Sequence, residues 1–215
     1  MVSDTLQRPP AVGIDIPPGY YEIAPDRIAD LNDKYLPMVA ATLPEASAST
    51  VTRTMQFLLG TMISNNALYC GIGVHRSVRS SESIVSWLTV SSFAYGPERN
   101  PRLVISDLVA AKADREEAGL LEIVDLGRCP ALYFETTTRH EKPDIPNYPE
   151  TSDDIAVFQI QATVPSPSSE SIAAIDFSTA NAPHGPEYRT MVLGMAQSVE
   201  FPTPPLELGS LSIAI

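Results

Sequence analysis

The residues of this chain that could do catalytic or metal chemistry begin with three histidines, His75, His140 and His184. No two of them have an H-x-H or H-E-x-x-H spacing, so we predict no metal site. A serine hydrolase of the common type carries its nucleophile in a G-x-S-x-G turn, and the chain has no such segment. The catalytic alternative that stays open is a hydrolase-type Ser-His-Asp site assembled from loops without a linear motif, near His140 and His184.

Other candidate groups have structural interpretations. The chain has neither G-x-G-x-x-G nor G-x-x-x-x-G-K-[ST], so we predict no nucleotide cofactor and no other cofactor. The paired carboxylates Asp153 and Asp154 follow a proline-rich loop and are interpreted as a solvated turn. Trp87 falls in an apolar, strand-like run and is predicted to lie in the core rather than to form a ligand platform.

The overall composition limits the class of partner. Acidic residues number 26 and basic residues 14, which gives a net charge of −12. Such a chain repels nucleic-acid phosphates and anionic lipid surfaces, so we expect neither as a partner. No stretch reaches the roughly 20 apolar residues of a membrane helix, and no signal peptide is recognisable, so we expect a cytoplasmic protein. Cys70 and Cys129 lie in apolar runs without a C-x-x-C spacing and are predicted to be buried and reduced.

The elements that would position these residues follow from hydrophobic periodicity. In residues 155–164, Ala156, Phe158, Ile160 and Ala162 alternate with Gln159 and Gln161, which indicates a half-buried antiparallel strand. Apolar residues at helical spacing predict helices, among them 101–118 with a stripe of Leu103, Val104, Leu108 and Ala111, and 186–198 with Met191, Val192 and Met195 buried. The full set of predicted strands is 19–23, 67–74, 84–90, 121–126, 131–137, 155–164 and 172–178, and the helices are 26–43, 51–63, 101–118 and 186–198.

Most of these strands are joined as hairpins, which favours a mostly antiparallel sheet packed by helices, an α+β fold. We find no repeat and no interdomain linker. The prolines divide the chain into an extended arm over 1–18, a single α+β domain over 19–201 and a proline-rich apolar tail over 202–215.

Three segments carry a resemblance to a known family: the opening PPGYYEI, the stretch LLEIVDLGRCPALYFE, and the run from VFQIQATVPSP to YRTMVLGMAQSVEF. In their order and apolar pattern they resemble the Mog1/PsbP-like α/β sandwich. Their local amino-acid sequence is similar to that of small actinobacterial proteins of this class. The resemblance covers roughly residues 17–201. It implies a binding or assembly factor and carries no catalytic residue onto this chain.

The tail contains a second pattern that points to partners. Apolar residues alternate almost regularly after Pro202, Pro204 and Pro205, at Leu206, Leu208, Leu211, Ile213 and Ile215. An extended peptide of this kind docks in a groove or on a sheet edge, either of its own domain or of a partner. Its Leu-Gly-Ser-Leu core resembles the C-terminal peptides that load cargo into encapsulin shells. We therefore expect a non-enzymatic binding or accessory protein that acts through protein-protein contacts, with homo-oligomerisation left open.

Overall fold

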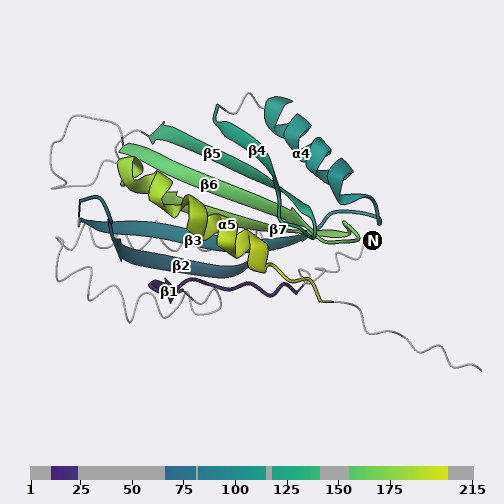
Figure 1. The fold of residues 1–215 in the computed structure, drawn as a ribbon, viewed down its shortest axis with the longest axis horizontal. Helices are drawn as coiled ribbons and strands as arrows, with labels where there is room; N and C mark the ends of the chain where they lie inside the picture. The colour runs from purple at the N-terminus through teal and green to yellow at the C-terminus, as the bar shows by residue number, and fades with distance from the viewer. Residues whose placement is uncertain (1–10, 24–65, 81, 115–117, 141–154, 203–215) are drawn as a thin grey trace, which may run out of the picture.

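The computed structural model describes residues 11–23, 66–80, 82–114, 118–140 and 155–202 (Figure 1). Seven described strands form one antiparallel sheet in the order β1-β2-β3-β7-β6-β5-β4. The α+β class and the antiparallel sheet predicted from the sequence are confirmed. The strands are β1 (Tyr20–Glu22), β2 (Ala67–Arg76), β3 (Ser83–Ala94), β4 (Leu120–Asp125), β5 (Pro130–His140), β6 (Ile155–Pro165) and β7 (Ser171–Thr179).

The alternation in β6 sorts its side chains between the two faces of the sheet as predicted. Phe158, Ile160 and Ala162 belong to the main hydrophobic core, whereas Gln159 and Gln161 are half-buried and lie on the opposite face. Ala156, predicted to share the core face, is only half-buried and stands outside this core. The strand therefore contributes to the core through its central residues.

The helical segment that covers the core face begins differently from the prediction. Residues 182–188 form a 3-10 helix, η3 (Ala182–Tyr188), and the α-helix α5 (Arg189–Ser198) begins only after it. Pro186 has no N–H to donate, which disfavours α-helical bonding across this turn. Figure 1 shows α5 lying across the sheet, and Val192 and Met195 are buried in the core. Met191, predicted to be buried, is half-buried.

A charged contact fixes the start of α5 to the sheet. Arg189 donates from Nε and Nη2 to the two carboxylate oxygens of Glu135 on β5, and the Tyr133 hydroxyl donates to the same carboxylate over 2.9 Å. The hydrogen bonds from Arg189 hold the pKa of Glu135 below its ordinary value. The carboxylate thus stays charged and anchors the helix.

The helix α4 (Pro101–Asp114) packs on the other face. It contacts β5 and β6, and its Lys112 ammonium lies 3.9 Å from the centre of the Phe134 ring, which points away from the main core. The predicted apolar stripe was wrong in part: Val104 and Ile105 are buried, but Leu103 and Ala111 are exposed. Residues 104, 105 and 108 form the inward face, so the helix is rotated relative to the prediction.

Part of the predicted N-terminal arm contacts the domain. Gly13 and Glu200 exchange two backbone hydrogen bonds of 2.8 Å, and Val12, Ile14 and Ile16 pack against the core. The predicted helices 26–43 and 51–63, the pair Asp153 and Asp154, and the tail from residue 203 lie outside the described residues. Among the helices that are described, none has the length and hydropathy to cross a membrane.

Candidate functional site

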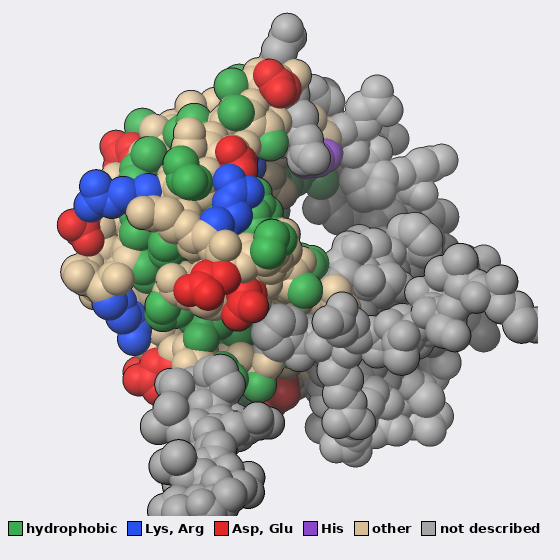
Figure 2. Space-filling model, turned by 90° about the vertical axis from the view of Figure 1, so that its right-hand side faces the viewer, with side chains coloured by type: hydrophobic (Ala, Val, Ile, Leu, Met, Phe, Trp, Pro, Cys, Tyr) green, Lys and Arg blue, Asp and Glu red, His purple; other side chains and the backbone are tan. Residues whose placement is uncertain are grey.

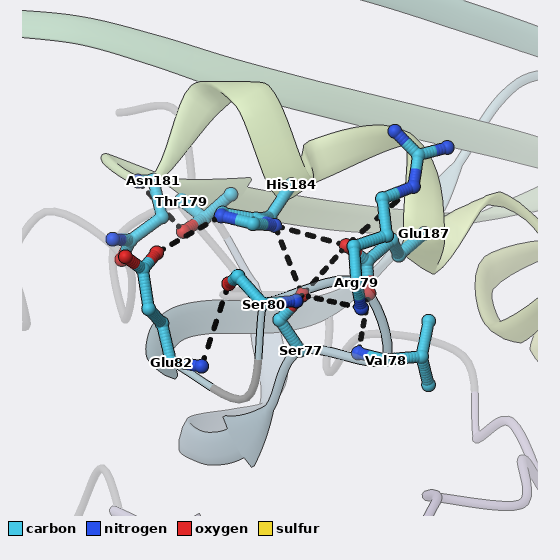
Figure 3. Close-up of polar contacts among 9 residues, drawn as sticks. All are labelled: Ser77, Val78, Arg79, Ser80, Glu82, Thr179, Asn181, His184 and Glu187. Atoms are coloured by element: carbon cyan, nitrogen blue, oxygen red, sulfur yellow. Dashed lines mark hydrogen bonds and ion pairs between the residues drawn. The ribbon is translucent and has the colours of Figure 1, made fainter.

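The structure brings one of the predicted histidines together with a serine and two carboxylates (Figure 3). His184 and Glu187 lie on η3, while Ser77 and Glu82 lie on the turn that joins β2 to β3. Nδ1 of His184 is 3.0 Å from the Ser77 hydroxyl and 2.9 Å from Glu187, and Nε2 is 3.1 Å from Glu82. Sequence separation hides this cluster, because the Ser77–His184 pair spans most of the domain without a linear motif.

The hydrogen bonds of Ser77 oppose a nucleophilic role. Its hydroxyl donates to Glu187 over 2.9 Å and accepts the backbone N–H groups of Arg79 and Ser80. Because that hydroxyl proton goes to Glu187 and both oxygen lone pairs accept backbone N–H groups, the Ser77 hydroxyl has no proton to give to Nδ1 of His184. Ser77 is also only 4% exposed. A serine nucleophile instead needs a free approach and a neighbouring base that accepts its proton.

The charges of the cluster lead to the same conclusion. Hydrogen bonds to Glu187 and Glu82 raise the pKa of His184, and the bond from His184 lowers the pKa of Glu187. Carboxylate contacts at both ring nitrogens favour the imidazolium form of His184, which has no nitrogen lone pair to accept a serine proton. We describe these residues, Ser77, Glu82, His184 and Glu187, as the hairpin clamp, since they hold the β2–β3 turn against η3.

The remaining histidines do not extend this cluster. His140 is exposed at the end of β5, and its Nε2 lies 2.8 Å from the hydroxyl of Thr138 on the same strand. His75 lies between the rings of Tyr20 and Tyr188, and burial lowers its pKa. Within the described ranges, no hydrogen bond or ion pair joins His140 to His184, and no group of three His, Cys, Asp or Glu residues could hold a metal ion.

A second candidate site is the edge of the sheet at β4, which has a partner strand on one side only among the described strands. Ile123 is 61% exposed and Leu120 is 44% exposed on this strand. Figure 2 shows the end of the molecule where α4 and the β4–β5 hairpin lie, with hydrophobic side chains interspersed among acidic and basic ones. The edge therefore combines exposed apolar side chains with main-chain groups that the described sheet leaves unpaired.

A hollow of about 520 Å³ adjoins this edge. It is lined by Ile123 and Asp125 of β4, by Arg102 and the buried Ile105 of α4, and by Cys129, which directly precedes β5. The β4–β5 turn beside it is fixed: Gly127 has φ of +84° and donates to Asp125, and Arg128 donates to the carbonyls of Gln197 and Val199. The hollow thus lies between α4 and a hairpin turn that these hydrogen bonds hold in place.

A third candidate, which we call the sheet groove, lies on the face opposite α5 and has a volume of about 620 Å³. Trp87 lines it and is half-buried, so the prediction that Trp87 belongs to the core was wrong. The reason is that α5 covers the core face of β3, where Leu88 lies, and Trp87 points the other way. The sequence signal was present in the polar alternation of β6, but only Gln159 and Gln161 were identified from it.

The two cysteines and the tail complete the predicted positions. Cys70 and Cys129 are both buried and form no disulfide, as predicted, and burial raises the pKa of each thiol. The proposed docking residues Leu206, Leu208, Leu211 and Ile213 lie outside the described residues. No family model, curated protein or solved structure matches this chain.

Proposed function

We propose that this chain is a non-enzymatic binding protein that acts through protein-protein contacts, with an extended segment of its partner adding to the edge of the sheet at β4. The observation that carries the proposal is the exposed apolar edge of β4 beside a hollow. Main-chain groups of an edge strand supply hydrogen bonds to an added strand, and a neighbouring pocket selects its side chains. The partner segment we expect is extended, with alternating apolar residues, one of which enters the hollow near Ile123.

The hairpin clamp argues for a binder over the hydrolase alternative. Ser77 is buried with its hydroxyl fully engaged, and His184 is held between carboxylates. We also propose that the fold belongs to the Mog1/PsbP-like class. Helices on both faces of an antiparallel sheet support this proposal. The two buried cysteines without a disulfide are consistent with a reducing compartment and support the cytoplasmic location that we propose.

The test compares one edge variant with a matched surface variant. Ile123→Lys places a charge on the exposed edge, and Val78→Lys places the same charge on the β2–β3 turn, where Val78 is 90% exposed. We expect partners captured by the wild type to be lost with Ile123→Lys and kept with Val78→Lys. Hydrogen exchange of the complex should show new protection of the β4 amides, because strand addition pairs them. Equal capture by both variants, or unprotected β4 amides, would refute edge docking.

The second contact in this proposal is the tail. Its alternating apolar residues support docking as an extended peptide, and the Leu208–Leu211 segment suggests an encapsulin shell protein as one partner class to test. Truncation after Phe201 should leave the melting temperature unchanged and abolish binding of the tail's partner. If the truncated chain instead unfolds or precipitates, the tail belongs to the fold and tail docking is wrong. Sedimentation of the full chain, with and without the tail, shows whether the partner is a second copy.

A further inference from the structure

The floor of the sheet groove is a regular grid of side chains from four neighbouring strands. In one row across the sheet, Trp87 of β3 is followed by Ser178 of β7, Gln159 of β6 and Thr136 of β5. In the next row the order is Thr89, Asp176, Gln161 and Phe134. All eight line the groove. Each row therefore combines one aromatic ring with three polar groups, and the two rings lie at opposite ends of the grid.

We infer that the sheet groove is a binding site for a small uncharged molecule that carries several hydroxyl groups, of the size of a mono- or disaccharide. Its volume of about 620 Å³ falls within the roughly 300–1,000 Å³ typical of small-molecule sites. The central polar side chains, Gln159, Gln161, Asp176 and Ser178, are each half-buried, so the floor is open to a ligand from solvent.

The chemistry of the floor selects for hydroxyl groups. Serine and threonine hydroxyls and glutamine amides both donate and accept hydrogen bonds, as the hydroxyls of a polyol do. Part of this pattern is already set: the Gln161 amide donates to Asp176 over 2.7 Å, which leaves the Gln161 carbonyl and the second Asp176 oxygen to bind a ligand. Burial raises the pKa of Asp176, and its carboxyl oxygens can accept hydrogen bonds from the hydroxyl groups of a ligand.

The aromatic and charged residues of the groove limit further which class of ligand it can bind. The Trp87 Nε1–H donates to Thr89 over 3.1 Å, which fixes the indole orientation and leaves its half-buried ring to contact the apolar C–H surface of a sugar. Lys112 is the one basic residue among the described lining residues, and it lies over the Phe134 ring. A phosphorylated or carboxylate ligand would need a cluster of cationic donors, which this lining does not provide.

The groove and the β4 edge are separate sites, so this inference does not depend on the proposed protein docking. Trp87 is the single tryptophan of the chain, which makes its fluorescence a direct reporter of the groove. We would titrate the full chain with neutral mono- and disaccharides, with amino acids as zwitterions and with sugar phosphates, using calorimetry in parallel. We expect a saturable change in emission with at least one neutral sugar and with neither charged class.

Variants then locate the binding. Gln159→Ala and Asp176→Ala should each weaken binding of the sugar at least tenfold, since each removes a polar group from the floor of the groove. Val78→Ala, on the exposed β2–β3 turn, should leave its affinity unchanged. The circular dichroism spectrum of each variant confirms folding. Binding of charged ligands only, affinity equal in all variants, or no saturable response to any neutral sugar would overturn the inference.

Discussion

Replacing Met195 by aspartate tests how the closing helix packs on the sheet. Met195 is 3% exposed and lies in the main core on α5. Loss of a buried methionine side chain removes about 1.5–3 kcal/mol of transfer free energy. Burial of an aspartate without a partner costs a further amount of about 2–3 kcal/mol when a raised pKa neutralises the group, and more if the group stays charged. Together these give a destabilisation of about 4–6 kcal/mol, a large part of the roughly 5–15 kcal/mol that holds a typical domain folded.

The control introduces the same residue on the same helix. Gln197 is exposed on the last turn of α5, so Gln197→Asp adds the same charge near the same helix end without entering the core. Urea unfolding followed by Trp87 fluorescence and circular dichroism gives both free energies of unfolding. For a domain of this size, we expect Met195→Asp to lower the melting temperature by about 10–20 °C and Gln197→Asp to change its stability by less than about 0.5 kcal/mol. Equal midpoints for the two variants would refute the packing described for α5.

Two further predictions concern the hairpin clamp and η3. The pKa of His184 is raised, so its contribution to stability is full below its ordinary value of 6.5 and is lost as the pH rises through the folded-state pKa. The pKa of Glu187 is lowered, so its contribution is full above 4.5 and is lost as the pH falls through the folded-state pKa. His184→Gln should therefore lower the melting temperature more at about pH 5.5 than at about pH 8.5; a deficit that grows with pH would contradict the charge assignment. Gly185→Ala would drive a Cβ into the Phe158 ring and should cost about 1–3 kcal/mol, whereas Gly194→Ala meets open space on α5 and should stabilise by up to about 1 kcal/mol. Chemical unfolding measures both glycine variants, and equal effects would contradict the contact at Gly185.

The strands were predictable because their signals are local. The alternation from Phe158 to Ala162 follows directly from the burial of one face, and the β4–β5 hairpin follows from Gly127 at a turn that requires positive φ. The rotation of α4 was not predictable, since Leu103 and Ile105 are both apolar and composition does not decide which of them faces the sheet. Pairing between distant strands leaves no local signal either.

The candidate sites show the same division. Trp87 lies in an apolar run, and an aromatic residue in such a run suits either the core or the wall of a groove, so the sequence does not distinguish the two. Ser77 and His184 meet only after β2, η3 and the strands between them are placed. Gln159 and Gln161 were correctly assigned to the face away from the core, but the groove they line needs β3, β5 and β7 beside them. A site built from side chains on four strands becomes visible only with the strand order.

The position of β7 between β3 and β6 has a consequence for synthesis on the ribosome. When β3 has been synthesised, its hairpin partner β2 is already present, but its other edge pairs with β7, as in Leu88 with Phe177. In the same way, Gly13 can pair only after Glu200 has been synthesised. The β2–β3 hairpin therefore emerges with an unpaired inner edge that carries core residues, and it keeps that edge until β7 follows. Such long-range closure slows folding and exposes a strand edge to other chains. A nascent chain of this protein should be most prone to aggregate, and most in need of a chaperone, between the emergence of β3 and that of β7.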